Sequence, residues 1–193
     1  MQQVIEFLRK YHNLIRVFGF IILVTLIVTF FINCVYSPVI VVGDSMNPTL
    51  NENDFILVDS FHGADDLERF DIIVFPYKYN NKLNVIKRII GMPGDTIEIK
   101  DNVIYINGEV LKEFYGYYDE SIPSKYPDVA PVMLSFDEYF VMGDNRNESL
   151  DSRSNTIGLI EEREIIGKAV FVLFPGMDEK HPNRDLSRIG VLS

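Results

Sequence analysis

The sequence has few of the side chains that build disulfides and metal centres. Its 193 residues include a single cysteine, Cys34, and three scattered histidines, His12, His62 and His181. One cysteine excludes an internal disulfide and any zinc site built from cysteines. His62 or His181 could serve as a catalytic base, but no recognisable catalytic residue lies beside either. We therefore interpret both as exposed loop residues and expect no metal site.

Positive charge is also scarce. The chain has 18 basic and 28 acidic residues, a formal net charge of −10. The part after residue 36 is more acidic still, with 15 basic and 27 acidic residues. Such a charge argues against nucleic acid as a partner. We interpret it as a charge that keeps a globular domain soluble.

One long stretch, 17–36, has no charged residue. A helix of this length crosses a hydrocarbon core of about 30 Å. A cleaved signal peptide would end in a small-residue pattern such as Ala-x-Ala, which is absent. A lipoprotein signal would need a small residue before Cys34, where the chain has Asn33. The stretch is therefore predicted to be a retained transmembrane helix.

The charges before this helix predict its orientation. Arg9, Lys10 and Arg16 precede it, opposed only by Glu6. Because lysine and arginine stay on the cytoplasmic side, we expect a single-pass protein of the cell membrane. Residues 1–16 are predicted to be cytoplasmic, 17–36 to span the membrane, and 37–193 to form one extracytoplasmic domain.

That domain has the pattern of a β protein. Short β-branched or alternating runs recur, and no long 3.6-residue period follows residue 36. The predicted strands cover 39–42, 55–58, 71–75, 85–90, 96–100, 103–106, 109–111, 139–142 and 168–174. Asp101-Asn102 and Asn107-Gly108 are typical of tight hairpin turns. We predict a mostly antiparallel fold, either a barrel or two packed sheets.

Two segments lack apolar periodicity. Residues 113–131 are rich in tyrosine, proline, aspartate and serine, and we predict a long surface excursion that is mobile or lines a cleft. The tail from residue 176 is polar, and we predict that it is peripheral.

Lys87 is unusual because it interrupts an apolar strand. If Val85, Lys87 and Ile89 share the inner face, the ammonium group enters the core, where burial lowers its pKa. A neutral amine can take a proton from a serine hydroxyl, and Ser–Lys pairs are an alternative to Ser-His-Asp. The alternative is that Lys87 reaches past the sheet edge into water. Ser45, just after the apolar stretch, could likewise be either a nucleophile or only a turn residue.

Three segments together favour the catalytic interpretation. They are Ser-Met-Asn-Pro-Thr-Leu at 45–50, Lys-Arg-Ile-Ile-Gly-Met-Pro-Gly-Asp at 87–95, and Gly-Asp-Asn-Arg-Asn-Glu-Ser-Leu-Asp-Ser-Arg at 143–153. In sequence, order and spacing they resemble the type I signal peptidases, membrane-anchored endopeptidases that use a serine and a lysine. The short interval between Pro93 and Gly143 resembles the compact, single-anchor form of Gram-positive members.

The resemblance implies roles for the matching residues. Ser45 would be the nucleophile, Lys87 the general base, and Ser149 the hydroxyl that orients the lysine amine. The backbone N–H of Ser45 would stabilise the oxyanion. Some relatives place a serine two positions before the nucleophile as a second donor, where this chain has Gly43.

Two further groups of residues follow from the resemblance. Asp151, Arg153 and Arg88 would form a supporting ion-pair network. A signal peptide would add as an extended strand between 38–43 and 84–86. Pockets for small residues at positions −1 and −3 would have as walls Val39, Val41, Leu50 and Ile86.

The implied function is cleavage of N-terminal signal peptides on the outer side of the membrane, without a cofactor. The implied partners are signal peptides of exported preproteins, membrane lipid and the secretion translocon. Two alternatives remain open. One is a processing peptidase for a narrow set of surface or pilin-like precursors, and the other is a non-catalytic relative that binds signal peptides.

Overall fold

A computed structural model describes residues 11–60, 66–122, 125–177 and 182–192. His62 and His181, and the charged residues Arg9 and Lys10, lie outside the described residues. The chain divides into two units, Met1–Ser37 and Pro38–Ser193, and each is described by itself.

The described part of the first unit contains the helix α2, His12–Val35. It begins before the predicted stretch and includes Arg16. The segment His12–Phe30 is long and apolar enough to cross a membrane, by length and composition. The hydroxyl of Thr25 donates to the carbonyl of Ile21, 2.9 Å away, so this polar group is satisfied within the helix.

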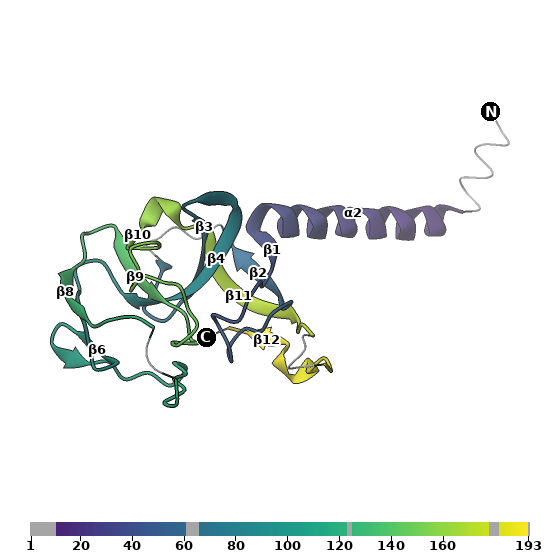
Figure 1. Cartoon of the computed structure of the whole chain (residues 1–193). Helices are drawn as coiled ribbons and strands as arrows, with labels where there is room; N and C mark the ends of the chain where they lie inside the picture. The colour runs from purple at the N-terminus through teal and green to yellow at the C-terminus, as the bar shows by residue number, and fades with distance from the viewer. Residues whose placement is uncertain (1–10, 61–65, 123–124, 178–181, 193) are drawn as a thin grey trace. The chain divides into compact units, whose positions relative to one another are not determined.

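The second unit is built from two antiparallel sheets, which confirms the predicted fold class. The larger has the strand order β1-β2-β11-β3-β4-β9-β10, with β12 beside β11. The smaller has the order β7-β6-β5-β8. Figure 1 shows β6 and β8 on one side of this unit and β11 and β12 on the other, with β9 and β4 between.

The strands agree with the sequence pattern at most positions. Their bounds are β1 Tyr36–Ile40, β2 Phe55–Asp59, β3 Ile72–Tyr77, β4 Asn80–Gly91, β5 Thr96–Lys100, β6 Val103–Ile106, β7 Glu109–Val110, β8 Val129–Met133, β9 Glu138–Met142, β10 Ile160–Glu161, β11 Gly167–Phe174 and β12 Gly190–Val191. Among the described residues, 3₁₀ turns are assigned at η2 Glu162–Glu164 and η3 Leu186–Arg188.

Strand β4 is central because it contributes to three apolar clusters. Ile86 packs with Val41 and Val58, whereas Ile89 packs with Ile73 and Val141 on a second cluster. Ile90 belongs to a third cluster, which joins the smaller sheet to the larger. Successive side chains of a strand point to opposite faces, so a strand with apolar material on both sides is buried along its length.

The segment 113–131 departs from the prediction. Tyr115 is buried and packs against the third cluster, and the last residues of the segment form β8, which pairs with β5. Pro131 is tolerated in β8 because this strand lies at the edge of the smaller sheet. The prediction of a surface excursion was therefore wrong for these parts, because single aromatic and edge-strand contacts leave no periodic signal.

The tail after residue 176 is also not merely peripheral. β12 pairs with β11, and Leu192 packs against the cluster that contains Val41 and Leu50. Its polar composition hid these contacts, because only one of its apolar side chains reaches that core.

The hairpin between β5 and β6 provides a stability test. Asp101 and Asn102 have φ of 51° and 64°, a turn that matches the right-handed strand twist. Asn102→Ala should lower the free energy of unfolding by about 1 kcal/mol, because alanine is strained at positive φ. Asn102→Gly should be close to wild type, and equal urea midpoints for all three proteins would contradict the turn geometry.

Candidate active site

Ser45 lies in the connection between β1 and β2, where the chain reverses tightly. Gly43 has φ of +83°, a conformation that favours glycine. The N–H of Asn47 donates to the carbonyl of Asp44, and that of Leu50 donates to the carbonyl of Met46. Met46 and Leu50 are buried in the core beneath this turn, so the turn is fixed and Ser45 stays half-buried at its surface.

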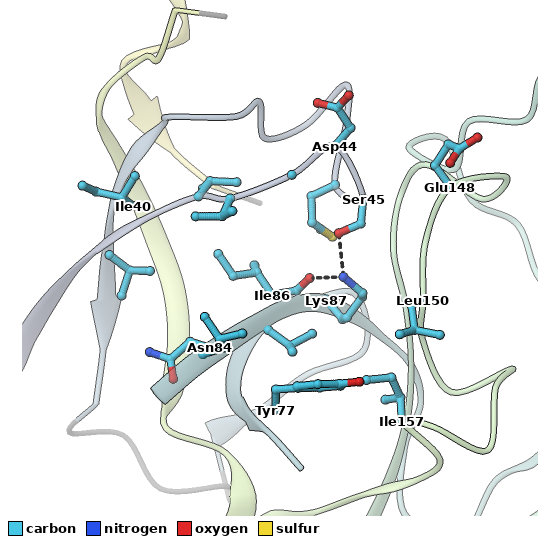
Figure 2. A pocket seen from close by; sticks show the side chains of 17 residues that line it. Ile40, Asp44, Ser45, Tyr77, Asn84, Ile86, Lys87, Glu148, Leu150 and Ile157 are labelled. Atoms are coloured by element: carbon cyan, nitrogen blue, oxygen red, sulfur yellow. Dashed lines mark hydrogen bonds between the residues drawn. The ribbon is translucent and has the colours of Figure 1, made fainter. Parts of the chain in front are cut away.

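Lys87 reaches Ser45 from the middle of β4. Its side chain is only 4% exposed, and Val85 and Ile89 on either side of it pack against one cluster. The amine Nζ lies 2.6 Å from Ser45 Oγ and donates to the carbonyl of Ile86 at 2.8 Å, as Figure 2 shows. The side chain of Lys87 therefore lies on the buried face of β4 and does not extend past the sheet edge into water.

The environment of Lys87 favours its neutral form. Burial lowers the pKa of this amine from 10.5 to about 8, against the opposing effect of the carboxylates of Asp151 and Asp144. The guanidinium of Arg153 lowers it further. At neutral pH a larger fraction of this amine is therefore neutral than in an exposed lysine.

The segment 143–153 holds the serine turn from the other side. The backbone N–H of Asn145 donates to the carbonyl of Ser45, 3.1 Å away, and its side-chain amide donates to the carbonyl of Asp44. Gly143 lies where the two segments approach each other most closely. A Cβ there would lie 2.3 Å from both the Ser45 carbonyl oxygen and Ser149 Oγ, so only glycine permits this approach.

Ser149 is fully buried beside this contact. Its Oγ accepts a hydrogen bond from the backbone N–H of Gly143 at 3.1 Å. Within the described parts of the chain, no hydrogen bond joins Ser149 to Lys87. The hydroxyl is thus placed near the catalytic candidates, and its action on the lysine stays a prediction.

The supporting ion pairs form, but with one partner changed. Asp151 pairs with Arg153 at 2.8 Å, as predicted. Arg88 makes a two-point contact with Asp144, at 2.9 and 2.7 Å, instead of with Asp151. Arg88 and Lys87 are neighbours on one strand and point to opposite faces, which directs the guanidinium to Asp144.

Sequence reasoning missed the residues that surround these pairs. Glu113 forms a two-point ion pair with Arg146, whose Nε also donates to the Gly143 carbonyl at 3.1 Å. The ring of Tyr115 lies 4.0 Å from the Arg88 guanidinium carbon, which is a cation–π contact. Glu113 lies 33 residues before Arg146, and Tyr115 follows Arg88 in the chain by more than 20 residues. No local sequence pattern indicates contacts between residues so far apart.

A pocket of about 540 Å³ opens beside the Ser45–Lys87 pair. Its apolar walls include Val39, Val41 and Ile86, three of the four residues predicted to line it. Leu50 is different, since it is fully buried in the core and does not line the pocket. The side chain of Leu50 points into the core because the turn that begins at Met46 packs its apolar residues inward. Figure 2 shows further lining residues, among them Tyr77, Leu150 and Ile157.

The backbone N–H of Ser45 belongs to the turn that borders the pocket. Among the described residues, no hydrogen bond uses this N–H as donor. The Gly43 position, which has no side-chain donor, has open space around its Cα on the side where a side chain would stand. A backbone donor without a hydrogen-bond partner among the described residues therefore lies next to the Ser45 hydroxyl.

The chain was compared with known proteins. The family described as "Signal peptidase, peptidase S26" matches residues 14–174. Signal peptidase I P of Bacillus subtilis subsp. natto is 39% identical over 161 residues, which cover 80% of this chain and 86% of that protein. Signal peptidase I S of Bacillus subtilis strain 168 is 35% identical over 158 residues, 78% of this chain and 84% of that protein.

A solved signal peptidase I from Enterococcus faecalis V583 is 35% identical, with a TM-score of 0.46 over 53% of this chain and 96% of that chain. The family match spans the serine turn, the lysine strand and the loop 143–153, the segments that meet at the pocket. This agreement of extent, identity and site confirms the predicted resemblance: the chain belongs to the signal peptidase family, peptidase S26.

Proposed function

We propose that this protein is a membrane-anchored serine endopeptidase that removes signal peptides from exported preproteins with a Ser45–Lys87 dyad. The observation that carries the proposal is the 2.6 Å contact between Ser45 Oγ and the buried Lys87 amine. Membership of the signal peptidase family supports signal peptides as the substrates. The presence of the serine, the lysine and the open pocket together favours an enzyme over a non-catalytic binding relative.

The acylation step follows from the dyad. The neutral Lys87 amine takes the proton from Ser45 Oγ as the oxygen attacks the scissile carbonyl carbon. The negative charge moves to the carbonyl oxygen, where the Ser45 N–H donates to it. When the C–N bond breaks, the lysine ammonium gives its proton to the leaving amine, which becomes the N-terminus of the mature protein.

In deacylation, water takes the place of Ser45 as the attacking group. Lys87, neutral again, takes a proton from a water molecule that attacks the acyl ester, and the ammonium returns a proton to Ser45 Oγ. Ser149 is proposed to orient the amine in these steps. Its buried Oγ next to Gly143 supports this role, because the hydroxyl hydrogen is left to rotate toward an acceptor.

Substrate recognition is proposed to use the pocket and the strands that border it. An extended cleavage region would lie between the segment 38–43 and the start of the buried part of β4, adding as a strand. Val41 and Ile86 are buried and line the pocket, and their branched side chains are proposed to restrict it to small residues. Alanine-like residues at −1 and −3 would then be preferred.

The location is proposed from the helix. α2 would cross the membrane once, with residues 1–16 in the cytoplasm, 17–36 in the bilayer and 37–193 outside. Membrane lipid would surround the helix, and the secretion translocon would deliver the substrates. This placement would hold Ser45 near the outer membrane surface, where the end of a membrane-inserted signal peptide emerges.

The dyad is tested by substitution. Ser45→Ala and Lys87→Ala should each lower the cleavage rate of a preprotein in detergent by about 10³-fold or more, because each removes a reacting group. Lys87→Arg should be equally inactive, since a guanidinium stays charged. Lys168→Ala on β11, which breaks an ion pair with Asp71, is the matched control and should retain activity. Full activity in any dyad variant would refute the assignment.

The pH profile tests the protonation state. The folded-state pKa of Lys87 is lowered to about 8, so the fraction of neutral base falls as pH falls through this value. The ratio kcat/KM should therefore drop about tenfold per pH unit on the acidic side, with an apparent pKa near 8. A rate that stays flat from about pH 5 to 9 would contradict a lysine base.

The pocket is tested by cleavage-site preference. Val41→Ala and Ile86→Ala enlarge its floor and should raise cleavage after valine relative to alanine at −1 by about tenfold. Val58→Ala removes two methyl groups from the same core cluster, as Val41→Ala does, but does not line the pocket, and serves as control. Identical preferences in all four proteins would show that these side chains do not form the pocket walls.

A further inference from the structure

The C-terminal segment, which lies beyond the family match, is bonded to the turn that carries Ser45. The match ends at residue 174, and the turn η3 (Leu186–Arg188) follows later in the chain. Arg188 lies 139 residues after Thr49, yet its Nη2 donates to the Thr49 carbonyl at 3.0 Å. A polar tail expected to be peripheral therefore contacts the backbone four residues from the nucleophile.

Arg188 also pairs with a buried carboxylate at the base of the same turn. Asp54 is fully buried, and its two oxygens accept from Arg188 Nη1 at 3.0 Å and Nη2 at 2.6 Å. The same carboxylate accepts from the backbone N–H groups of Asn51 and Gly176 at 2.8 and 2.7 Å. Asp54 thus has four donors, two of them on a side chain that can be substituted.

Backbone hydrogen bonds connect the Arg188–Asp54 contact to the turn that carries Ser45. The N–H of Val41 donates to the Asp54 carbonyl, and the N–H of Asn53 donates to the Val41 carbonyl, which closes the turn at its base. Inside this closed loop, Arg188 fixes the Thr49 side and Asn145 fixes the Ser45 carbonyl. The arginine fork suits this task because its planar guanidinium donates to both Asp54 oxygens and to the Thr49 carbonyl in fixed directions, whereas a lysine ammonium donates from a single point.

We propose that Arg188 is a positioning residue, which holds the 41–54 turn so that Ser45 Oγ stays within reach of the Lys87 amine. The proposal rests on the Ser45–Lys87 function above. Arg188 does not touch the substrate pocket, since that pocket is lined by other residues. Its loss should therefore slow the chemical step and leave substrate binding unchanged.

The test is steady-state cleavage of one preprotein by the full-length chain in detergent. Arg188→Ala should lower kcat about tenfold or more and change KM by less than about twofold. Arg188→Lys keeps the charge beside Asp54 but loses the fork, so its kcat should lie between alanine and wild type. Wild-type kcat in both variants would overturn the proposal, as would a change confined to KM.

General destabilisation is separated by a control. Lys168→Ala breaks an ion pair with Asp71 in which the basic side chain is 32% exposed, against 20% for Arg188. If Lys168→Ala lowers kcat as much as the Arg188 variants at an equal thermal midpoint, positioning is refuted. If Arg188→Ala does not fold, Arg188→Lys decides alone by the same criterion.

The outcome also separates this proposal from the dyad. Ser45→Ala measured in the same assay gives the rate without a nucleophile. An active Ser45→Ala protein would refute the proposed function itself. An inactive Ser45→Ala protein beside fully active Arg188 variants would refute the positioning role alone.

Discussion

The site depends on keeping an amine out of water in the middle of a β-strand. Lys87 is buried between apolar side chains, and this desolvation is the largest cause of its lowered pKa. Two carboxylates nearby, Asp151 and Asp144, act in the opposite direction. Each of them has an arginine of its own, Arg153 and Arg88, which compensates its charge. The ion pairs thus let the core contain both carboxylates while the pKa of Lys87 stays below its ordinary value.

Ser45, the proposed nucleophile, is held by contacts from separate parts of the chain. Its own turn is packed on Met46 and Leu50, and the loop that begins at Gly143 bonds to its backbone. Gly143 permits this approach, because any side chain there would overlap the Ser45 carbonyl and Ser149. The C-terminal segment adds a third set of contacts through Arg188. A serine placed from several sides has little freedom to leave its partner, which favours a rapid reaction.

The sequence predicted the parts of the fold that depend on local patterns. The alternating strands 96–100 and 103–106 were found with their bounds, because period-two alternation and the Asp101-Asn102 turn act over a few residues. It failed at β8 and Tyr115, whose places depend on partners far along the chain. The sequence also assigned Leu50 to the pocket wrongly, because closeness to Ser45 along the chain does not tell which way a side chain points.

By itself the sequence determined which groups are present: a serine after an apolar helix, a lysine inside an apolar strand, and three motifs in the order typical of one family. The tertiary structure decided what those groups meet. It placed Lys87 at 2.6 Å from Ser45, gave Arg88 to Asp144, and brought Arg188 back to the serine turn. The physical reason is range, because strand and turn preferences act between neighbours, whereas burial and ion pairing depend on residues that only folding brings together.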